Sequence, residues 1–286
     1  MKRVTEIPHF PERPNDGHKG TFGRAMIVAG SRGMSGAVIL SGLGALRGGA
    51  GLVYLAIPDS ILNIVAGYEP SYLTLPLSSD EEGRLSAENE DSIFEYGEEM
   101  SAVAIGPGLG QSSDLESLVE SLYQNLSVPM VVDADGLNNL VDSKSLLQKP
   151  KYTRILTPHP GEFSHLCGLS IEEVQSSRED VAFYFAEKSG TVLILKGSNT
   201  VVTDGEQIYV NQTGNNGLAT GGSGDVLTGL LTGLLAQSME PFDAACLGVY
   251  LHGLAGDIGA EDKSQPGLIA SDLPFYLTQA IKKHML

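Results

Sequence analysis

The sequence predicts a three-layer α/β/α domain, in which a mostly parallel central sheet lies between two layers of helices. Short apolar runs rich in β-branched residues alternate along the chain with longer segments of helical character, a pattern typical of parallel sheets. The 286 residues include 35 glycines, well above the usual share of about 7%. Many of these glycines follow the apolar runs, which indicates loops that approach a ligand at one edge of the sheet.

The strands of this sheet are expected at six apolar runs, each of which ends in Gly, Pro, Asp or Lys: Ala25–Ala29, Leu52–Ile57, Ala102–Ile105, Val128–Val132, Arg154–Leu156 and Val192–Leu195. Near the end of the chain, Thr200–Val210 holds two short strands around Asp204-Gly205. An Asp-Gly dipeptide is typical of a two-residue hairpin. We therefore expect an antiparallel hairpin at one edge of the sheet.

Six segments are expected to form helices, and several of them open on a Ser or Asp that can cap the first turn: Gly36–Gly48, Ser113–Leu126, Ile171–Lys188, Asp225–Gln237, Asp243–Ile258 and Asp272–Lys283. The acidic, turn-rich stretch Ser78–Glu99 lies between runs of the same buried character. We interpret it as a surface excursion within one domain, and we expect residues 1–286 to form that single domain.

Composition excludes several classes of function. The formal charge of −17 at pH 7 repels phosphate backbones and anionic lipid surfaces, which disfavours nucleic-acid and membrane partners. Cys167 and Cys246 form no CxxC pattern and no Cys/His cluster, which argues against a disulfide framework and a zinc site and favours a cytoplasmic protein. The P-loop, GxGxxG, GxSxG and HExxH motifs are all absent. P-loop NTPases, Rossmann dehydrogenases, serine hydrolases and zincins are therefore disfavoured.

The run Gly221-Gly222-Ser223-Gly224-Asp225 leads directly into an apolar helix. A helix N-terminus preceded by flexible residues offers free N–H groups to an anion, and its positive end stabilises a phosphoryl group during transfer. Asp225 stands where a base would accept the proton of the attacking hydroxyl. The alternative is that Asp225 only caps the helix.

Three further strand ends carry candidate residues. Lys196 is a candidate phosphate or nucleotide contact, or a solvated strand end. His159 is a candidate substrate contact, and Glu162 either faces a metal-bound water or is an ordinary first-turn acid. Asp133 and Asp135 form a pair that suits Mg²⁺ or hydroxyl groups, or else a capped turn.

Eight segments, in this order, resemble the ADP/ATP-dependent NAD(P)H-hydrate dehydratase family, a branch of the ribokinase-like superfamily. They are His18–Gly23, Ala29–Ala37, Ala45–Val53, Gly106–Gly110, Val132–Asn138, Thr157–Glu162, Leu195–Gly197 and Asn215–Gly229. Within the superfamily, Gly222–Asp225 resembles the anion hole with its catalytic aspartate. Thr157–Glu162 is similar to the TPNxxE motif of sugar kinases, and His159 in place of the Asn favours the dehydratase branch.

The resemblance implies an enzyme that repairs NADH or NADPH hydrated at C6 of the nicotinamide ring. ADP or ATP would phosphorylate the C6 hydroxyl and phosphate would then leave, with Mg²⁺ as cofactor. Asp225 would be the catalytic residue, with an anion hole formed by Gly222, Ser223 and Gly224. The nucleotide would contact Lys196, Gly197, Ser198, Asn199, Thr200 and Gly224. The hydrate would contact Ala37, Gly108, His159 and Asp225.

The family also suggests a homotetramer, and its single-domain members typically use ADP. Many members carry a fused N-terminal epimerase domain. The matching region here begins by about His18, so an epimerase is expected to be a separate chain.

Two alternatives remain open. A kinase of a small hydroxylated vitamin precursor shares Gly222–Asp225, but it would lack the His18–Gly23 segment and His159. A non-catalytic nucleotide sensor on the same fold would need no base, and the presence of Asp225 argues against it.

Overall fold

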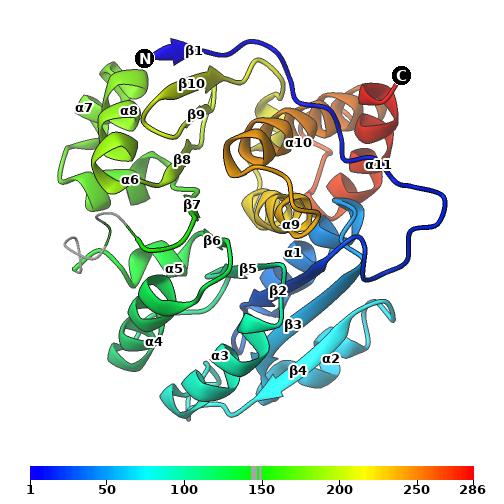
Figure 1. The fold of residues 1–286 in the computed structure, drawn as a ribbon, viewed down its shortest axis with the longest axis vertical. Coiled ribbons are helices and arrows are strands. Elements are labelled where there is room, and N and C mark those ends of the chain that lie inside the picture. The colour runs from blue at the N-terminus through cyan, green and yellow to red at the C-terminus, as the bar shows by residue number, and fades with distance from the viewer. Residues whose placement is uncertain (143–146, 148–149) are drawn as a thin grey trace.

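The computed structural model describes residues 1–142, 147 and 150–286. The strands of these residues form one sheet in the order β1-β10-β9-β8-β7-β6-β5-β2-β3-β4 (Figure 1). Their bounds are β1 Lys2–Arg3, β2 Arg24–Val28, β3 Leu52–Pro58, β4 Leu73–Leu77, β5 Ala102–Ile105, β6 Met130–Val132, β7 Arg154–Leu156, β8 Val192–Leu195, β9 Val201–Thr203 and β10 Gln207–Val210. The bounds of β5, β7 and β8 are those predicted.

The sheet is mostly parallel, as predicted. All pairs from β4 to β8 are parallel, and β9 runs antiparallel to both β8 and β10. The predicted hairpin is therefore confirmed, although its connection comprises residues 204–206 rather than two residues. The Asp204 carboxylate accepts hydrogen bonds from two N–H groups of this turn. The hairpin is also not outermost, because β1 pairs with β10 beyond it.

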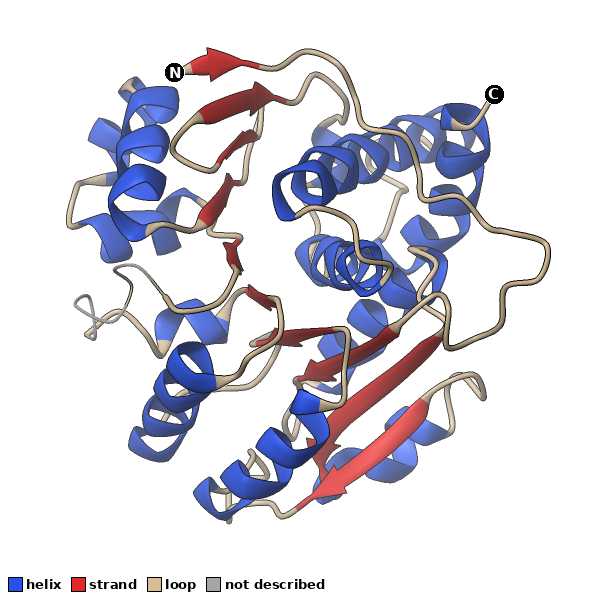
Figure 2. Ribbon diagram, viewed as in Figure 1, coloured by secondary structure: helices blue, strands red, loops and turns tan. Residues whose placement is uncertain are grey.

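Helices cover both faces of the sheet, which confirms the three layers (Figure 2). One face is covered by α1 Ser35–Arg47, α2 Leu62–Ala66, α9 Ser223–Ala236, α10 Pro241–Lys263 and α11 Leu273–His284. The other is covered by α3 Glu90–Glu98, α4 Ser113–Asn125, α5 Asp135–Asn138, α6 Pro160–Cys167, α7 Ile171–Ser176 and α8 Arg178–Ser189. Among the described residues, no helix is both long and apolar enough to span a membrane.

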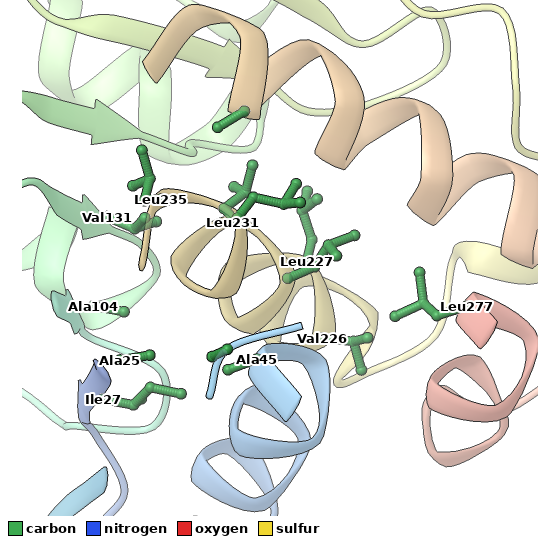
Figure 3. Close-up of a cluster of buried hydrophobic side chains, with 14 of the residues drawn as sticks. Ala25, Ile27, Ala45, Ala104, Val131, Val226, Leu227, Leu231, Leu235 and Leu277 are labelled. Atoms are coloured by element: carbon green, nitrogen blue, oxygen red, sulfur yellow. The ribbon is translucent and has the colours of Figure 1, made fainter. Parts of the chain in front are cut away.

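The two cores follow from the alternation of side chains along each strand. In β2, Ala25 and Ile27 belong to the core under α1 and α9, whereas Met26 and Val28 belong to the core under α3 and α4. Figure 3 shows Ala25 and Ile27 on the side of the sheet that faces α9. Because both faces are buried, the central strands are continuous apolar runs, which is why the sequence predicted them so well.

Several predicted bounds need correction. The segment Ile171–Lys188 forms two helices, because Ser177 leaves helical geometry with φ −142° and ψ 40°. The stretch Ser78–Glu99 is more than a surface excursion: it contains α3, and Leu85 and Ile93 within it are buried. Helix α10 ends at Lys263 rather than at the predicted Ile258, and α11 ends at His284 rather than at Lys283.

Helices α1 and α9 approach each other at glycines. A Cβ atom at Gly229 would lie 1.8 Å from the Ser41 carbonyl oxygen, and one at Gly44 would lie 2.3 Å from the Val226 carbonyl oxygen. Both values are far below van der Waals contact, and in each case the obstacle is backbone. The close packing of these two helices therefore requires glycine at both positions.

We predict that Gly229→Ala lowers the free energy of unfolding by roughly 3 kcal/mol, because the helices must separate to admit the methyl group. Gly36→Ala is the matched control in α1. No heavy atom lies within 4 Å of its added Cβ, so the variant should match or exceed wild-type stability by up to about 1 kcal/mol. Urea titration measures both, and equal stability of the two variants would contradict the prediction.

Candidate active site

The loops that follow β2, β5, β6, β7 and β8 meet at one edge of the sheet. These strands are neighbours and run parallel, so their carboxyl ends share that edge. Three residues predicted separately lie here: Asp133 and Lys196 directly follow β6 and β8, and His159 lies three residues beyond β7. This edge is where open α/β sheets bind ligands.

Lys196 and Asp133 form an ion pair at the centre of this edge. The Lys196 Nζ lies 2.6 Å from the Asp133 Oδ1, and the Thr228 hydroxyl donates a 2.7 Å hydrogen bond to the Asp133 Oδ2. The Glu162 Oε2 is 4.0 Å from the same ammonium nitrogen. The structure thus connects β6, α6, β8 and α9 through this one ion pair.

Burial and charge compete at these groups. Burial lowers the pKa of Lys196, but the negative charges of Asp133 and Glu162 outweigh it and leave the pKa above its ordinary value. Burial raises the pKa of Glu162, and Asp133 adds to the rise against the opposing charge of Lys196. Lys196 is therefore a fixed cation in this cluster. The alternative of a solvated strand end does not hold for its ammonium group.

Asp225 is not the cap of α9. The helix begins at Ser223, its N-cap is Gly222 with φ +93°, and no side chain forms a capping hydrogen bond. The Ser223 N–H donates to the Thr220 carbonyl oxygen. In the described part of the chain, no backbone acceptor contacts the N–H groups of Gly224 and Asp225. The capping interpretation is wrong, and the Asp225 carboxylate stands beside free donors.

The surroundings of Asp225 disfavour its charge. Burial raises the pKa of its carboxyl, the neighbouring charge of Asp133 raises it further, Lys196 lowers it, and Asp135 raises it, which together bring the pKa to about 7. A carboxyl group with a pKa near neutrality is suited to proton transfer. Asp225 is thus the titratable group best matched to general-base chemistry at this edge.

A pocket of about 610 Å³ opens on one side of the Gly222–Asp225 turn. It is bordered by Leu218, Leu227 and Val249 as apolar residues and by Asn215 as a polar one. Every residue predicted to contact the nucleotide lines it: Lys196, Gly197, Ser198, Asn199, Thr200 and Gly224. The volume falls within the usual range for a small-molecule or cofactor pocket, about 300–1,000 Å³.

The other predicted ligand residues divide between two places. An added Cβ at Gly108 would lie 3.0 Å from the Ala37 Cβ, so these two residues touch, and neither borders the pocket. The Gly110 N–H donates a 2.9 Å hydrogen bond to the Asp135 Oδ2, which ties this group to the acidic cluster. His159, by contrast, lines the pocket. Gly222 does not border the pocket and packs against Leu40 and Ala270.

His159 and Glu162 form a capping box at the start of α6. The His159 Nδ1 accepts from the N–H groups of Gly161 and Glu162, at 3.0 and 3.1 Å, and the Glu162 Oε2 accepts from the His159 N–H at 2.8 Å. The His159 Nε2 lies 3.3 Å from the Glu162 Oε1, and the imidazole remains 57% exposed, so a ligand can reach the ring. Both residues therefore have a structural role in addition to any contact with substrate.

The fit of this edge to Mg²⁺ is limited to an indirect contact. In the described residues, no group of three or more His, Cys, Asp or Glu side chains is arranged to hold a metal ion. The Asp133 carboxylate already pairs with Lys196 and Thr228. Nucleotide-bound Mg²⁺ is usually held by phosphates, water and one or two carboxylates. Glu162 fits such a contact through water.

Sequence reasoning missed the residues of α10 that support the pocket. The His252 Nε2 lies 2.9 Å from the Ser223 carbonyl oxygen, and the Asp257 carboxylate accepts from the Gly214 N–H and the Asn215 amide at 2.9 Å each. Burial lowers the pKa of His252 to about 4, so the ring is neutral. A histidine and an aspartate five residues apart in a largely apolar helix were the available signal.

Backbone strain also concentrates at the site. Ala134, between the two predicted aspartates, has φ +50° and ψ −120°, which is rare for any residue with a Cβ. This conformation sends Asp133 toward Lys196 and Asp135 toward Gly110. The sequence left Asp133 and Asp135 open as one ligand pair or as a capped turn, and the structure gives each carboxylate a different partner.

A family model and two curated relatives that match this chain are all named for NAD(P)H hydrate. A family model described as NAD(P)H-hydrate dehydratase matches residues 25–279. A bifunctional NAD(P)H-hydrate repair enzyme of Moorella thermoacetica is 42% identical over 96% of this chain, and the chain spans about half of that relative, 52% of its length. An ADP-dependent (S)-NAD(P)H-hydrate dehydratase of Bacillus subtilis is 35% identical, with 96% of this chain and 94% of the relative aligned.

Solved structures agree with these relatives. An ADP/ATP-dependent NAD(P)H-hydrate dehydratase of Bacillus subtilis, co-crystallised with ATP and Mg²⁺, has a TM-score of 0.81 and 30% identity, covering 98% of this chain and 100% of that one. A ribokinase of Cryptococcus neoformans, with a TM-score of 0.52, 13% identity and 91% and 99% coverage, shares the fold alone. The predicted ribokinase-like architecture is confirmed.

The raised pKa of Asp225 predicts a pH-dependent stability. Between about pH 4 and 7 the folded protein retains a proton that the unfolded chain releases, so this carboxyl lowers the free energy of unfolding as pH rises through that window. We predict that Asp225→Asn gains about 2–4 kcal/mol relative to wild type between pH 4 and pH 8. Urea titrations across this range measure it. A constant difference between the two proteins would show that Asp225 ionises as freely as in the unfolded chain.

Proposed function

The chain belongs to the NAD(P)H-hydrate dehydratase family, and on this premise we propose that it restores NADH and NADPH from their hydrated forms with ADP or ATP as phosphoryl donor. The observation that carries the proposal is the position of Asp225. It stands at the start of α9 beside free N–H groups, and burial brings the pKa of its carboxyl to about 7. A binding protein would need no such group.

In the proposed reaction, the Asp225 carboxylate accepts the proton of the C6 hydroxyl as that oxygen attacks the terminal phosphorus of the nucleotide. A new O–P bond forms, the bond to the bridging oxygen breaks, and AMP leaves when ADP is the donor. Loss of phosphate from C6 and of a proton from C5 then restores the double bond of the reduced ring. The predicted anion hole comprised Gly222, Ser223 and Gly224, but the Ser223 N–H already donates to the Thr220 carbonyl oxygen. The free N–H groups of Gly224 and Asp225 stabilise the phosphoryl group during transfer.

The division of the site supports the assignment of its two ligands. We propose that residues 196–200 and Gly224 contact the nucleotide, because all of them line the 610 Å³ pocket. We propose that Ala37 and Gly108, which lie outside that pocket, contact the hydrate together with His159, which borders the pocket and would lie where the two ligands meet. The hydroxyl of the hydrate must reach Asp225 from the opposite side of the phosphoryl group. The Lys196 cation, 2.6 Å from Asp133, lies beside Gly224 and attracts the phosphates.

Mg²⁺ is proposed as cofactor on the basis of the family. Glu162 would hold it through water, and the ion would neutralise charge on the nucleotide phosphates. The neighbouring residues act independently of it: Lys196 fixes the orientation of Asp133, and His159 fixes that of Glu162. Activity measured with and without a divalent chelator tests this assignment.

Organisation and location are also proposals. We propose that residues 1–286 act as one dehydratase unit, in a cytoplasmic homotetramer. One sheet that includes strands from residue 2 to residue 210 supports the single unit. The family resemblance supports the rest, and light scattering of the purified chain tests the tetramer.

We predict that Asp225→Asn lowers turnover of NADH hydrate by roughly 10²–10⁴-fold, the usual contribution of a general base, while nucleotide affinity stays within about twofold. Asn keeps the size of the side chain but cannot accept the hydroxyl proton. Turnover is followed as recovered absorbance of reduced nicotinamide with ADP or ATP, and nucleotide affinity by calorimetry.

Asp243→Asn is the matched control, because Asp243 is the third residue of α10 as Asp225 is of α9, and burial raises the pKa of its carboxyl too. It should keep wild-type turnover. In the wild type, kcat/KM should rise with pH up to about 7 and then level off, since the base must be ionised. Near wild-type turnover in Asp225→Asn would show that Asp225 is not the general base.

A further inference from the structure

Arg178 holds the backbone at the end of β8. Its Nη2 donates hydrogen bonds to the carbonyl oxygens of Leu195 and Lys196, at 2.9 and 3.2 Å, and its Nη1 donates to the Gln175 Oε1 at 3.0 Å. Lys196 is both the central cation of the site and the first residue of the nucleotide loop, residues 196–200. The Arg178 guanidinium therefore connects α8 to the residue on which the acidic cluster converges.

The guanidinium of Arg178 is partly removed from water, and its hydrogen bonds to the site offset the free-energy cost of that desolvation. Arg178 is half-buried, and burial lowers the pKa of its guanidinium. None of the ion pairs in the described residues includes it, although the neighbouring Glu179 pairs with Arg3 at 2.6 Å. A partly desolvated cation without a carboxylate partner is unfavourable unless specific hydrogen bonds offset the desolvation. Here the acceptors are two consecutive carbonyl groups of the site.

The break in the predicted helix explains how Arg178 comes to lie there. Helix α7 ends at Ser176, Ser177 has φ −142°, and α8 begins at Arg178 itself. Helix α8 packs on β8 and β9, so its first residue lies beside the strand end that carries Lys196. The break at Ser177 thus coincides with the residue that contacts the site.

Gly197 gives independent support. Its φ of +134° excludes residues with a Cβ, and a Cβ at this position would lie 3.3 Å from both the Nη1 and the Nη2 of Arg178. The loop therefore passes directly beside the guanidinium group. The backbone conformation of Gly197 thus leaves the space that the Arg178 guanidinium occupies.

We propose that Arg178 is a positioning residue for nucleotide binding, which holds the carbonyl groups of Leu195 and Lys196 so that residues 196–200 keep the shape of the pocket wall. This inference rests on the proposed role of that loop in nucleotide binding. Arg178 acts through the backbone of Lys196 and Gly197. It therefore affects the nucleotide and not the hydrate.

The test compares Arg178→Gln, Arg178→Lys and the control Arg3→Gln, which removes the neighbouring ion pair to Glu179 on the same helix. Arg178→Gln should raise the nucleotide KM about tenfold, as expected for the loss of charge-assisted hydrogen bonds, with the hydrate KM and kcat within about twofold. Arg178→Lys keeps the charge without the planar fork and should recover part of the loss. Arg3→Gln should match wild type.

Calorimetry with ADP measures the same loss without turnover, so it tests Arg178 even if the wild-type chain fails to dehydrate NADH hydrate.

Gly197→Ala, alone and combined with Arg178→Gln, supplies a second measurement. If both residues shape one loop, the combined loss of ADP affinity is smaller than the product of the single losses. If Arg178→Gln does not fold, Arg178→Lys carries the comparison. Unchanged ADP affinity, equal rises in both KM values, or fully additive losses would overturn the proposal.

Discussion

The ion pair between Lys196 and Asp133 is the interaction on which the site depends. It joins the ends of β6 and β8, which are separated by β7 in the sheet, and Thr228 attaches the same carboxylate to α9. Glu162 from α6 lies at the edge of the pair. Without a central cation, the carboxyl groups of Asp133, Glu162 and Asp225 would repel each other in a partly buried space. Leaving one member of a buried ion pair uncompensated typically costs about 3–5 kcal/mol. The cluster thus fixes four elements around one charge.

The second constraint is the close contact of α1 and α9. Gly44 and Gly229 let the two backbones approach to distances that no Cβ would allow, and this places the start of α9 next to Leu40 and the loops of the sheet edge. Helix α9 is buried along most of its length, so its N-terminus cannot shift to relieve the unfavourable burial of Asp225. The scaffold accepts a carboxyl group whose charge is disfavoured, and proton transfer is the function that such a group serves.

The supports of the proposed nucleotide pocket come from both helical layers. On one side of the sheet, His252 and Asp257 of α10 hold Ser223 and residues 214–215. On the other side, Arg178 of α8 holds the end of β8. The pocket wall consists largely of loops, and loops keep a defined shape only when their backbone groups have fixed partners. This explains why polar side chains of distant helices accompany the glycine-rich segments.

The sequence by itself determined the fold class, the positions of the central strands and the turn at Gly222–Asp225. These features depend on local patterns: β5, β7 and β8 are continuous apolar runs because they are buried on both faces, and glycines before an apolar helix indicate a tight turn at its start. The tertiary structure alone decided the rest. Lys196 and Asp133 are 63 residues apart, Ser177 divides a helix that local propensity would continue, and the pKa of Asp225 depends on burial by elements far along the chain. Such features arise from which strand ends become neighbours, and that is a property of the folded sheet rather than of any segment of the sequence.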